Sequence, residues 1–120
     1  MELISSKNIT NMSNPGVLSR QLLNPDNSKS TRVTITEVHL EPGAIQPRHI
    51  HEHSEQIWYA TKGCGKLLLA DDAETAFSEG DVVRFVDGDV HGLKNDSERE
   101  FVYISVTSPP LHFGYAYENK

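Results

Sequence analysis

Short runs in which hydrophobic and polar residues alternate recur along this chain, and turn-forming residues separate them. The clearest run spans residues 31–40, and one of its faces carries four residues: Thr34, Thr36, Val38 and Leu40. A period of two predicts a half-buried β-strand. The other predicted strands are Val17–Leu23, Gln56–Thr61, Lys66–Ala70, Thr75–Phe77, Val82–Val86, Val90–Leu93 and Phe101–Thr107.

Helical periodicity is missing from the pattern, whereas turn signals recur every few residues. Many short strands separated in this way predict an all-β barrel or jelly roll. We expect residues 1–16 to form a polar N-terminal arm that ends in the turn signal Asn14-Pro15-Gly16. Residues 17–107 are predicted to form the barrel. The aromatic-rich tail, 108–120, is predicted to pack on the barrel or on a second subunit.

Length and charge narrow the possible functions. A chain of 120 residues is long enough for one core, and its net charge of −6 argues against a nucleic-acid partner. No apolar run is long enough to span a membrane, and the N-terminal residues lack a signal-peptide pattern. The single cysteine, Cys64, cannot form an internal disulfide. These features predict a reduced, cytoplasmic setting with no membrane partner.

Two clusters of residues suggest a metal site. The first runs from Gly43 to Gly63 and contains His49, His51 and Gln56. On a strand, His49 and His51 would point to the same face, with Cα atoms roughly 6.5–7 Å apart. Imidazole nitrogens with an oxygen donor are suitable ligands for a divalent transition metal.

The second cluster runs from Gly80 to Asn95 and contains Gly88 and His91. If the intervening chain folds back as antiparallel strands, His91 can reach the histidines of the first cluster. His53 continues their alternation, but it lies in a probable turn and is a weaker candidate. His39 is expected to be structural.

Together the two clusters resemble the two sequence motifs of the cupin family. The first family motif is Gly, five residues, His-x-His, three or four residues, Glu, six residues, Gly. The second family motif is Gly, five residues, Pro-x-Gly, two residues, His, three residues, Asn. The spacings match over residues 43–95, and the strand pattern extends the likeness to 17–107. The resemblance implies a double-stranded β-helix, or jelly-roll, of the small single-domain cupin type.

The resemblance also implies a set of ligands and partners. One divalent transition-metal ion (Zn, Ni, Fe, Mn or Cu) would be held by His49, His51, Gln56 and His91. A small-molecule ligand is expected beside it. Small cupins of this type are commonly homodimers, so a homodimer is expected here too.

Two departures from the family motifs matter. Val86 stands where the family has proline, which costs only turn rigidity. Six residues separate Gln56 from Gly63, which is the spacing of the family glutamate from the closing glycine. Glu55 instead has the shorter family spacing from His51, with three residues between them. Strand parity allows only one of them to face inward, and the spacing to Gly63 favours Gln56. Glu55 would then be a candidate catalytic base or a partner that orients a ligand imidazole.

Strand parity also suggests which residues line the pocket. Trp58 shares a face with Gln56, so it would either wall the ligand or fill the core. In 101–107 two registers are possible: one turns Phe101, Tyr103 and Ser105 inward, and the other turns in an apolar set. Tyr103 is a candidate substrate contact in the first register only.

The sequence supports three hypotheses about function. The first is a mononuclear metalloenzyme of dioxygenase, isomerase or lyase type that acts on a small oxygenated or anionic organic molecule. The second is a non-catalytic module that binds a small molecule or a metal. The third is a metal-free structural barrel, which four intact donor positions disfavour. The fold alone does not choose among them.

Overall fold

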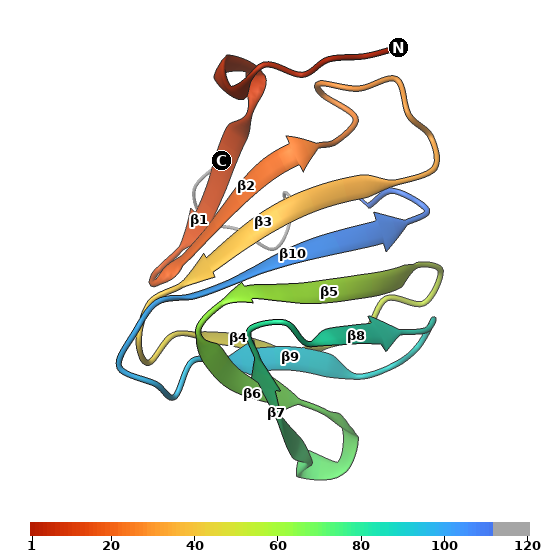
Figure 1. Cartoon of the computed structure of the whole chain (residues 1–120). Helices are drawn as coiled ribbons and strands as arrows, with labels where there is room; N and C mark the ends of the chain where they lie inside the picture. Colours follow the sequence, from red (N-terminus) through yellow and green to blue (C-terminus); the bar gives the residue numbers. More distant parts are fainter. Residues whose placement is uncertain (112–120) are drawn as a thin grey trace.

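The computed structural model describes residues 1–111, and two antiparallel sheets face each other in it (Figure 1). The larger sheet has six strands in the order β1-β2-β3-β10-β5-β8, and the smaller has four in the order β4-β9-β6-β7. The strands are β1 (Thr10–Asn14), β2 (Val17–Leu23), β3 (Thr34–Leu40), β4 (Ile45–His49), β5 (Glu55–Lys62), β6 (Cys64–Leu68), β7 (Glu74–Ser78), β8 (Val82–Phe85), β9 (His91–Lys94) and β10 (Phe101–Ser108). The predicted jelly-roll barrel is confirmed.

The chain passes from one sheet to the other between β5 and β6, and Gly63 alone separates these two strands. Gly63 has a φ of +83°, and a Cβ atom there would lie 2.6 Å from the carbonyl oxygen of Glu100. Both the left-handed backbone and the close approach require glycine. The glycine that closes the first cluster in the sequence is therefore a corner of the barrel.

The predicted strands are present, with boundaries that differ by a few residues. Val17–Leu23 is unchanged, whereas the run 31–40 forms a strand only from Thr34. Strand β1 was not predicted, because its polar residues show no hydrophobic alternation. It lies within the segment 1–16 and pairs with β2 through the turn at Pro15-Gly16, at the edge of the larger sheet.

Burial follows the predicted alternation in the central strands. In β3, the four residues predicted to share a face are all buried. In β10 the structure decides the open register, because Phe101, Tyr103, Ser105 and Thr107 are all buried, whereas of the alternative set only Val102 is buried and Ile104 and Val106 are partly exposed. Tyr103 therefore faces the barrel interior.

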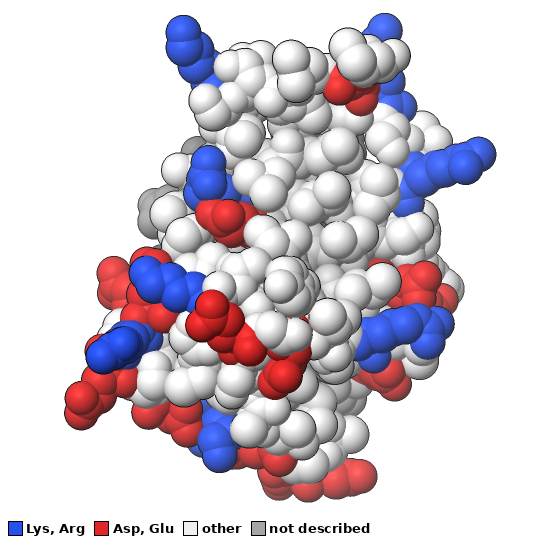
Figure 2. All heavy atoms as spheres, viewed as in Figure 1, with Lys and Arg blue, Asp and Glu red and all other residues white. Residues whose placement is uncertain are grey.

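The helical content is limited to two single turns of 3-10 helix, η1 (Ser6–Asn8) and η2 (Ala70–Asp72), among the residues described. Within 1–111, no helix has the length and apolar character needed to cross a membrane. On the face shown in Figure 2, lysine and arginine side chains form separate spots among acidic ones. Residues 112–120, which hold most of the predicted C-terminal tail and His112, lie outside the described part of the chain.

Candidate metal centre

Three histidine side chains meet at one end of the barrel interior. His49 ends β4, His51 follows in the next loop, and His91 begins β9. Their ring centroids lie 4.2 to 5.1 Å apart. One potential ligand nitrogen from each ring lies within 4.8 Å of the others. The expectation that His49 and His51 share one strand is wrong, because β4 ends at His49, yet the two rings still converge.

The pairing of β4 with β9 brings the two clusters of the sequence together. His49 lies opposite His91 in this pairing. The next residue, Gly92, is buried, and a Cβ atom there would lie 2.7 Å from the carbonyl oxygen of Gln46 on β4. Only glycine allows the two backbones to approach this closely. The sequence analysis missed Gly92, although a glycine inside a short strand is a signal of close backbone approach.

Backbone carbonyls orient two of the imidazole rings. The Nδ1 atom of His49 lies 2.8 Å from the Pro47 oxygen, and that of His91 lies 2.9 Å from the Asp89 oxygen. A carbonyl only accepts a hydrogen bond, so Nδ1 carries the proton in each ring and the lone pair stays on Nε2. Nε2 of His91 is buried with no hydrogen-bond partner among residues 1–111. A ring held in this way fits a metal ligand.

Burial keeps two of these imidazoles neutral near pH 7. It is the main reason that the pKa of His51 falls to about 4, and the electrostatic interaction with His49 adds to the effect. The pKa of His91 also falls to about 4, mainly through burial, although the Asp89 carbonyl opposes the change. Metal ions bind neutral imidazole, so both side chains are ready to act as ligands without losing a proton.

The alternation along β5 separates Gln56 from Glu55. Gln56 is buried, its Nε2 donates to Thr107 Oγ1 over 3.0 Å, and its Oε1 accepts from Trp58 Nε1 over 3.1 Å. Glu55 is half-buried on the other face of β5, where its carboxylate pairs with Arg84 over 2.8 Å. The structure thus places Gln56, and not Glu55, on the side of the histidines.

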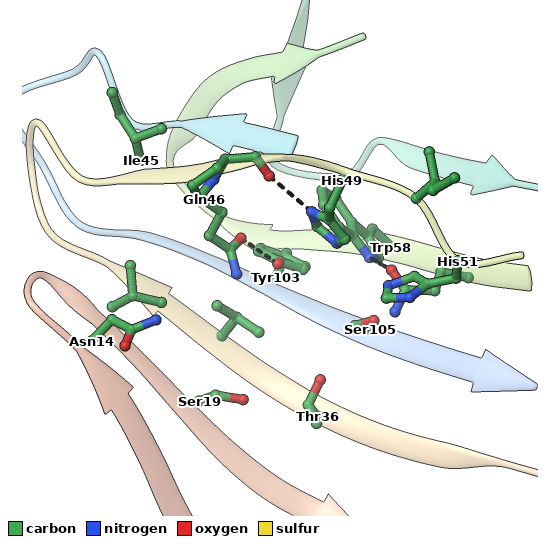
Figure 3. A pocket seen from close by; sticks show the side chains of 15 residues that line it. Asn14, Ser19, Thr36, Ile45, Gln46, His49, His51, Trp58, Tyr103 and Ser105 are labelled. Atoms are coloured by element: carbon green, nitrogen blue, oxygen red, sulfur yellow. Dashed lines mark hydrogen bonds between the residues drawn. The ribbon is translucent and has the colours of Figure 1, made fainter. Parts of the chain in front are cut away.

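A cavity of about 340 Å³ adjoins the histidine cluster (Figure 3). Its walls come from both sheets and from the β4–β5 loop, and the residues that line it are Asn14, Val17, Ser19, Thr36, Val38, Ile45, Gln46, Pro47, His49, Ile50, His51, Gln56, Trp58, Tyr103 and Ser105. No role in the site was predicted for Ser19 or Thr36, because a serine or threonine on a strand carries no signal of its own.

Trp58 and Tyr103 form the aromatic part of this cavity. Their ring centroids lie 4.5 Å apart, and Trp58 also contacts His91 at 5.6 Å. The hydroxyl of Tyr103 donates to Gln46 Oε1 over 2.6 Å. Both side chains are 2% exposed and belong to the hydrophobic core as well. Trp58 therefore fills the core and also lines the cavity, while its contact with a ligand stays a prediction.

The remaining histidines lie apart from the cluster. His53 is exposed in the loop before β5. His39 lies on the outer face of β3, where its ring nitrogens are 2.7 Å from Glu37 and 3.4 Å from Glu100. These positions agree with the structural role expected for His39.

Comparisons with known proteins agree with this architecture. A sequence model of the family described as "Cupin domain" matches residues 36–107. No curated protein matches the chain in sequence. Among solved structures, KdgF from Halomonas sp. is similar with a TM-score of 0.77 and 20% identity, over 92% of this chain and 96% of that one.

Two further structures have different stated activities. The polyketide cyclase RemF from Streptomyces resistomycificus has a TM-score of 0.76 and 21% identity, over 90% of this chain and 79% of that one. A sugar phosphate isomerase of the cupin superfamily from Silicibacter pomeroyi has a TM-score of 0.69 and 26% identity, over 78% of this chain and 60% of that one. Similar barrels thus carry unrelated chemistry, so the argument about function has to come from the site.

Proposed function

The chain belongs to the cupin family, and from that premise we propose that it is a mononuclear metalloenzyme for a small oxygen-bearing organic molecule. His49, His51 and His91 would hold one divalent transition-metal ion, with Gln56 as the fourth ligand. A bound ion would supply Lewis-acid or redox chemistry to an oxygen of the substrate. The proposed reaction is of dioxygenase, isomerase or lyase type.

The observation that carries this proposal is the convergence of the three imidazoles at the wall of a cavity. Their ligand nitrogens lie within 4.8 Å of one another, and His49 and His51 line the cavity of about 340 Å³. A histidine cluster on the outer surface would bind metal but would have no adjoining cavity for an organic ligand. Here, an open side of the cluster faces a space large enough for a small organic molecule.

Gln56 gives the proposed site a distinctive charge. Its carbonyl oxygen accepts one hydrogen bond from Trp58 and has a second lone pair available. Three imidazoles and an amide are all neutral, so a divalent ion would keep its full charge of about +2. An anionic oxygen, such as a carboxylate or an enolate, would then be the preferred additional ligand.

Other residues of the cavity would position the substrate. Trp58 and Tyr103 would contact its body, and the hydrogen bond from Tyr103 to Gln46 holds the phenol in place. We propose no catalytic role for Glu55, because its carboxylate is paired with Arg84 on the outside of the barrel.

A non-catalytic binding module is the second candidate, and one observation favours it. Among residues 1–111, no aspartate, glutamate or lysine lines the cavity, so the site has no obvious acid–base group apart from its histidines and Tyr103. Turnover of a small oxygenated substrate would support the enzyme. Tight binding without turnover would support the binding module.

Metal analysis tests the proposal directly. Protein purified without a tag or chelator is expected to contain close to one metal equivalent by mass spectrometry, to lose it to a chelator and to regain it from solution. The variant His91→Gln should lose this capacity, whereas His53→Gln, a change of an exposed histidine outside the cluster, should keep it. Equal metal content in the two variants would contradict the ligand assignment.

The identity of the metal refines the reaction type. Iron, manganese or copper would point to oxygen chemistry, which oxygen uptake with small diols and enols can test. Zinc or nickel would point to a lyase, an isomerase or a binding role. The homodimer and the cytoplasmic location remain predictions from the sequence, and sedimentation and cell fractionation would test them.

A further inference from the structure

We propose that the ligand of this site has an uncharged body that bears hydroxyl groups, and that it carries its single negative charge at the end that meets the metal. This inference rests on the proposed function and narrows its substrate class. A non-phosphorylated polyhydroxy acid fits the description, whereas a phosphorylated sugar does not. Three features of the cavity support the inference: the lack of charged side chains, the row of hydroxyls and the apolar residues on the side of β4.

Charged side chains are missing from the cavity wall. Within residues 1–111, the lining includes no aspartate, glutamate, lysine or arginine. Arg48 precedes a metal-site histidine in sequence, yet its guanidinium donates to the carbonyls of Leu69 and Ala73 over 2.8 and 3.3 Å. Arg84 and Arg20 pair with outward-facing glutamates. A phosphate group in the cavity would therefore lose water without gaining a cation, which is costly.

A row of hydroxyl groups lines the wall formed by the larger sheet. Ser19, Thr36 and Ser105 come from β2, β3 and β10, and Figure 3 shows Ser19 and Thr36 across the cavity from His49 and His51. Thr36 lies directly opposite Ser105 in the pairing of β3 with β10. The three residues are at most 6% exposed to outer solvent and line the cavity, and the Ser19 hydroxyl accepts a hydrogen bond from Gln21 Nε2 over 2.8 Å. Such hydroxyls can both donate to and accept from hydroxyls of a ligand.

The side of the cavity formed by β4 and the following loop carries apolar residues beside Gln46 and the two histidines. Ile45 and Pro47 from β4 and Ile50 from the following loop line it. A ligand between the two walls would need carbon–hydrogen groups on one side and oxygens on the other. Polyhydroxylated carbon chains offer both. The volume, about 340 Å³, lies near the lower limit for ligand pockets, so the ligand is small.

A panel of three acids tests the inference on zinc-loaded protein. Gluconate has the expected carboxylate, a neighbouring hydroxyl and an uncharged body. The probe 6-phosphogluconate differs from it by a phosphate, and 2-hydroxyhexanoate lacks the remaining hydroxyls. By titration calorimetry, gluconate should bind at least tenfold more tightly than 6-phosphogluconate. It should also bind about three- to tenfold more tightly than 2-hydroxyhexanoate, because each added hydrogen bond contributes modestly.

Variants of the hydroxyl row locate the effect. Thr36→Val and Ser105→Ala should each weaken gluconate binding by about three- to tenfold and leave the affinities for 2-hydroxyhexanoate and zinc unchanged. Thr34→Val is the matched control, since Thr34 is a buried threonine on the same strand that does not line the cavity. It should leave gluconate binding unchanged.

The outcomes separate this inference from the proposed function. Zinc affinity is measured first, and a protein that fails to bind zinc through the histidines would overturn both. If zinc binds, equal or tighter binding of 6-phosphogluconate would overturn the inference alone. Binding of none of the three acids, or a Thr34→Val effect as large as that of Thr36→Val, would overturn it as well.

Discussion

The two ends of the barrel interior differ in chemistry although the same strands build both. On β3, the inward residues change from Leu40 and Val38 at one end to Thr36 and Thr34 at the other. On β10 they change from Phe101 through Tyr103 to Ser105 and Thr107, and on β5 from Ala60 through Trp58 to Gln56. The core end is apolar, and the polar end contains the histidines.

This difference separates the end that stabilises the fold from the end that carries the proposed binding site. Burying apolar side chains at the core end favours folding by about 25 cal/mol per Å² of apolar area. Burying hydroxyls, an amide and imidazoles contributes less and costs free energy where a group lacks a partner, as the Thr34 hydroxyl does among residues 1–111. The part of this polar end that lines the cavity is the proposed ligand site. Substitutions at the two ends should therefore have different effects.

The largest expected effect is on stability, from a truncation at the core end. Phe101→Ala should lower the free energy of unfolding by about 3–5 kcal/mol, because Phe101 is fully buried against Phe77 and Tyr103. Chemical denaturation measures this loss. Ile104→Ala, on the outward face of the same strand, should cost less. Metal affinity of the folded Phe101→Ala variant should stay normal, and a matching loss of metal affinity would mean that the two ends are not separate.

Lowering the pH should reduce the free energy of unfolding through the buried histidines of the polar end. In protein stripped of metal, unfolded histidines take up protons near pH 6.5, whereas folded His51 and His91 do so only near their pKa of about 4. Between these values the unfolded state binds more protons, so stability is highest above pH 6.5 and declines as the pH falls toward 4. For each of these two histidines, a pKa near 4 in place of 6.5 corresponds to a loss of roughly 3 kcal/mol at the acid end of this range.

Denaturation curves at several pH values measure this decline. In His91→Gln the dependence between pH 6.5 and 4 should be shallower than in the unchanged protein. His53→Gln should keep the full dependence, because His53 is exposed. Identical pH dependence in the unchanged protein and in His91→Gln would contradict the role given to burial at the polar end.

The smallest expected effect concerns the charge of the metal site. Gln56→Glu should tighten metal binding and weaken the binding of acetate to the loaded protein, each by roughly tenfold, because a carboxylate lowers the net charge from +2 to +1. Competition with a coloured chelator measures the first affinity and calorimetry the second. Gln56→Met is the neutral control. It leaves the net charge of the metal site at +2, so it should not weaken acetate binding by lowering that charge. Equal acetate affinity in Gln56→Glu and the unchanged protein would contradict this account.

The sequence predicted much of the fold and part of the site. Strand alternation identified the residues that share a face of β3, and motif spacing identified His49, His51 and His91 as candidate ligands. The spacing to Gly63 favoured Gln56 for the inward position, where the structure places it. Strand β1 escaped prediction because sheet pairing holds its polar residues in place, and no hydrophobic pattern records that pairing.

By itself, the sequence determined which residues share a face, because side chains alternate strictly along an extended chain. It did not determine which face of β10 turns inward, since each set of residues there contains large apolar side chains. The pairing of β10 with β3 and β5 decided this and turned Tyr103 and Ser105 toward the cavity.

The convergence of the site also belongs to the tertiary structure. His49 and His91 are far apart along the chain, and they meet only because β4 pairs with β9 across the close approach at Gly92. A local pattern carries no information about such long-range pairing, whereas the packed barrel fixes it.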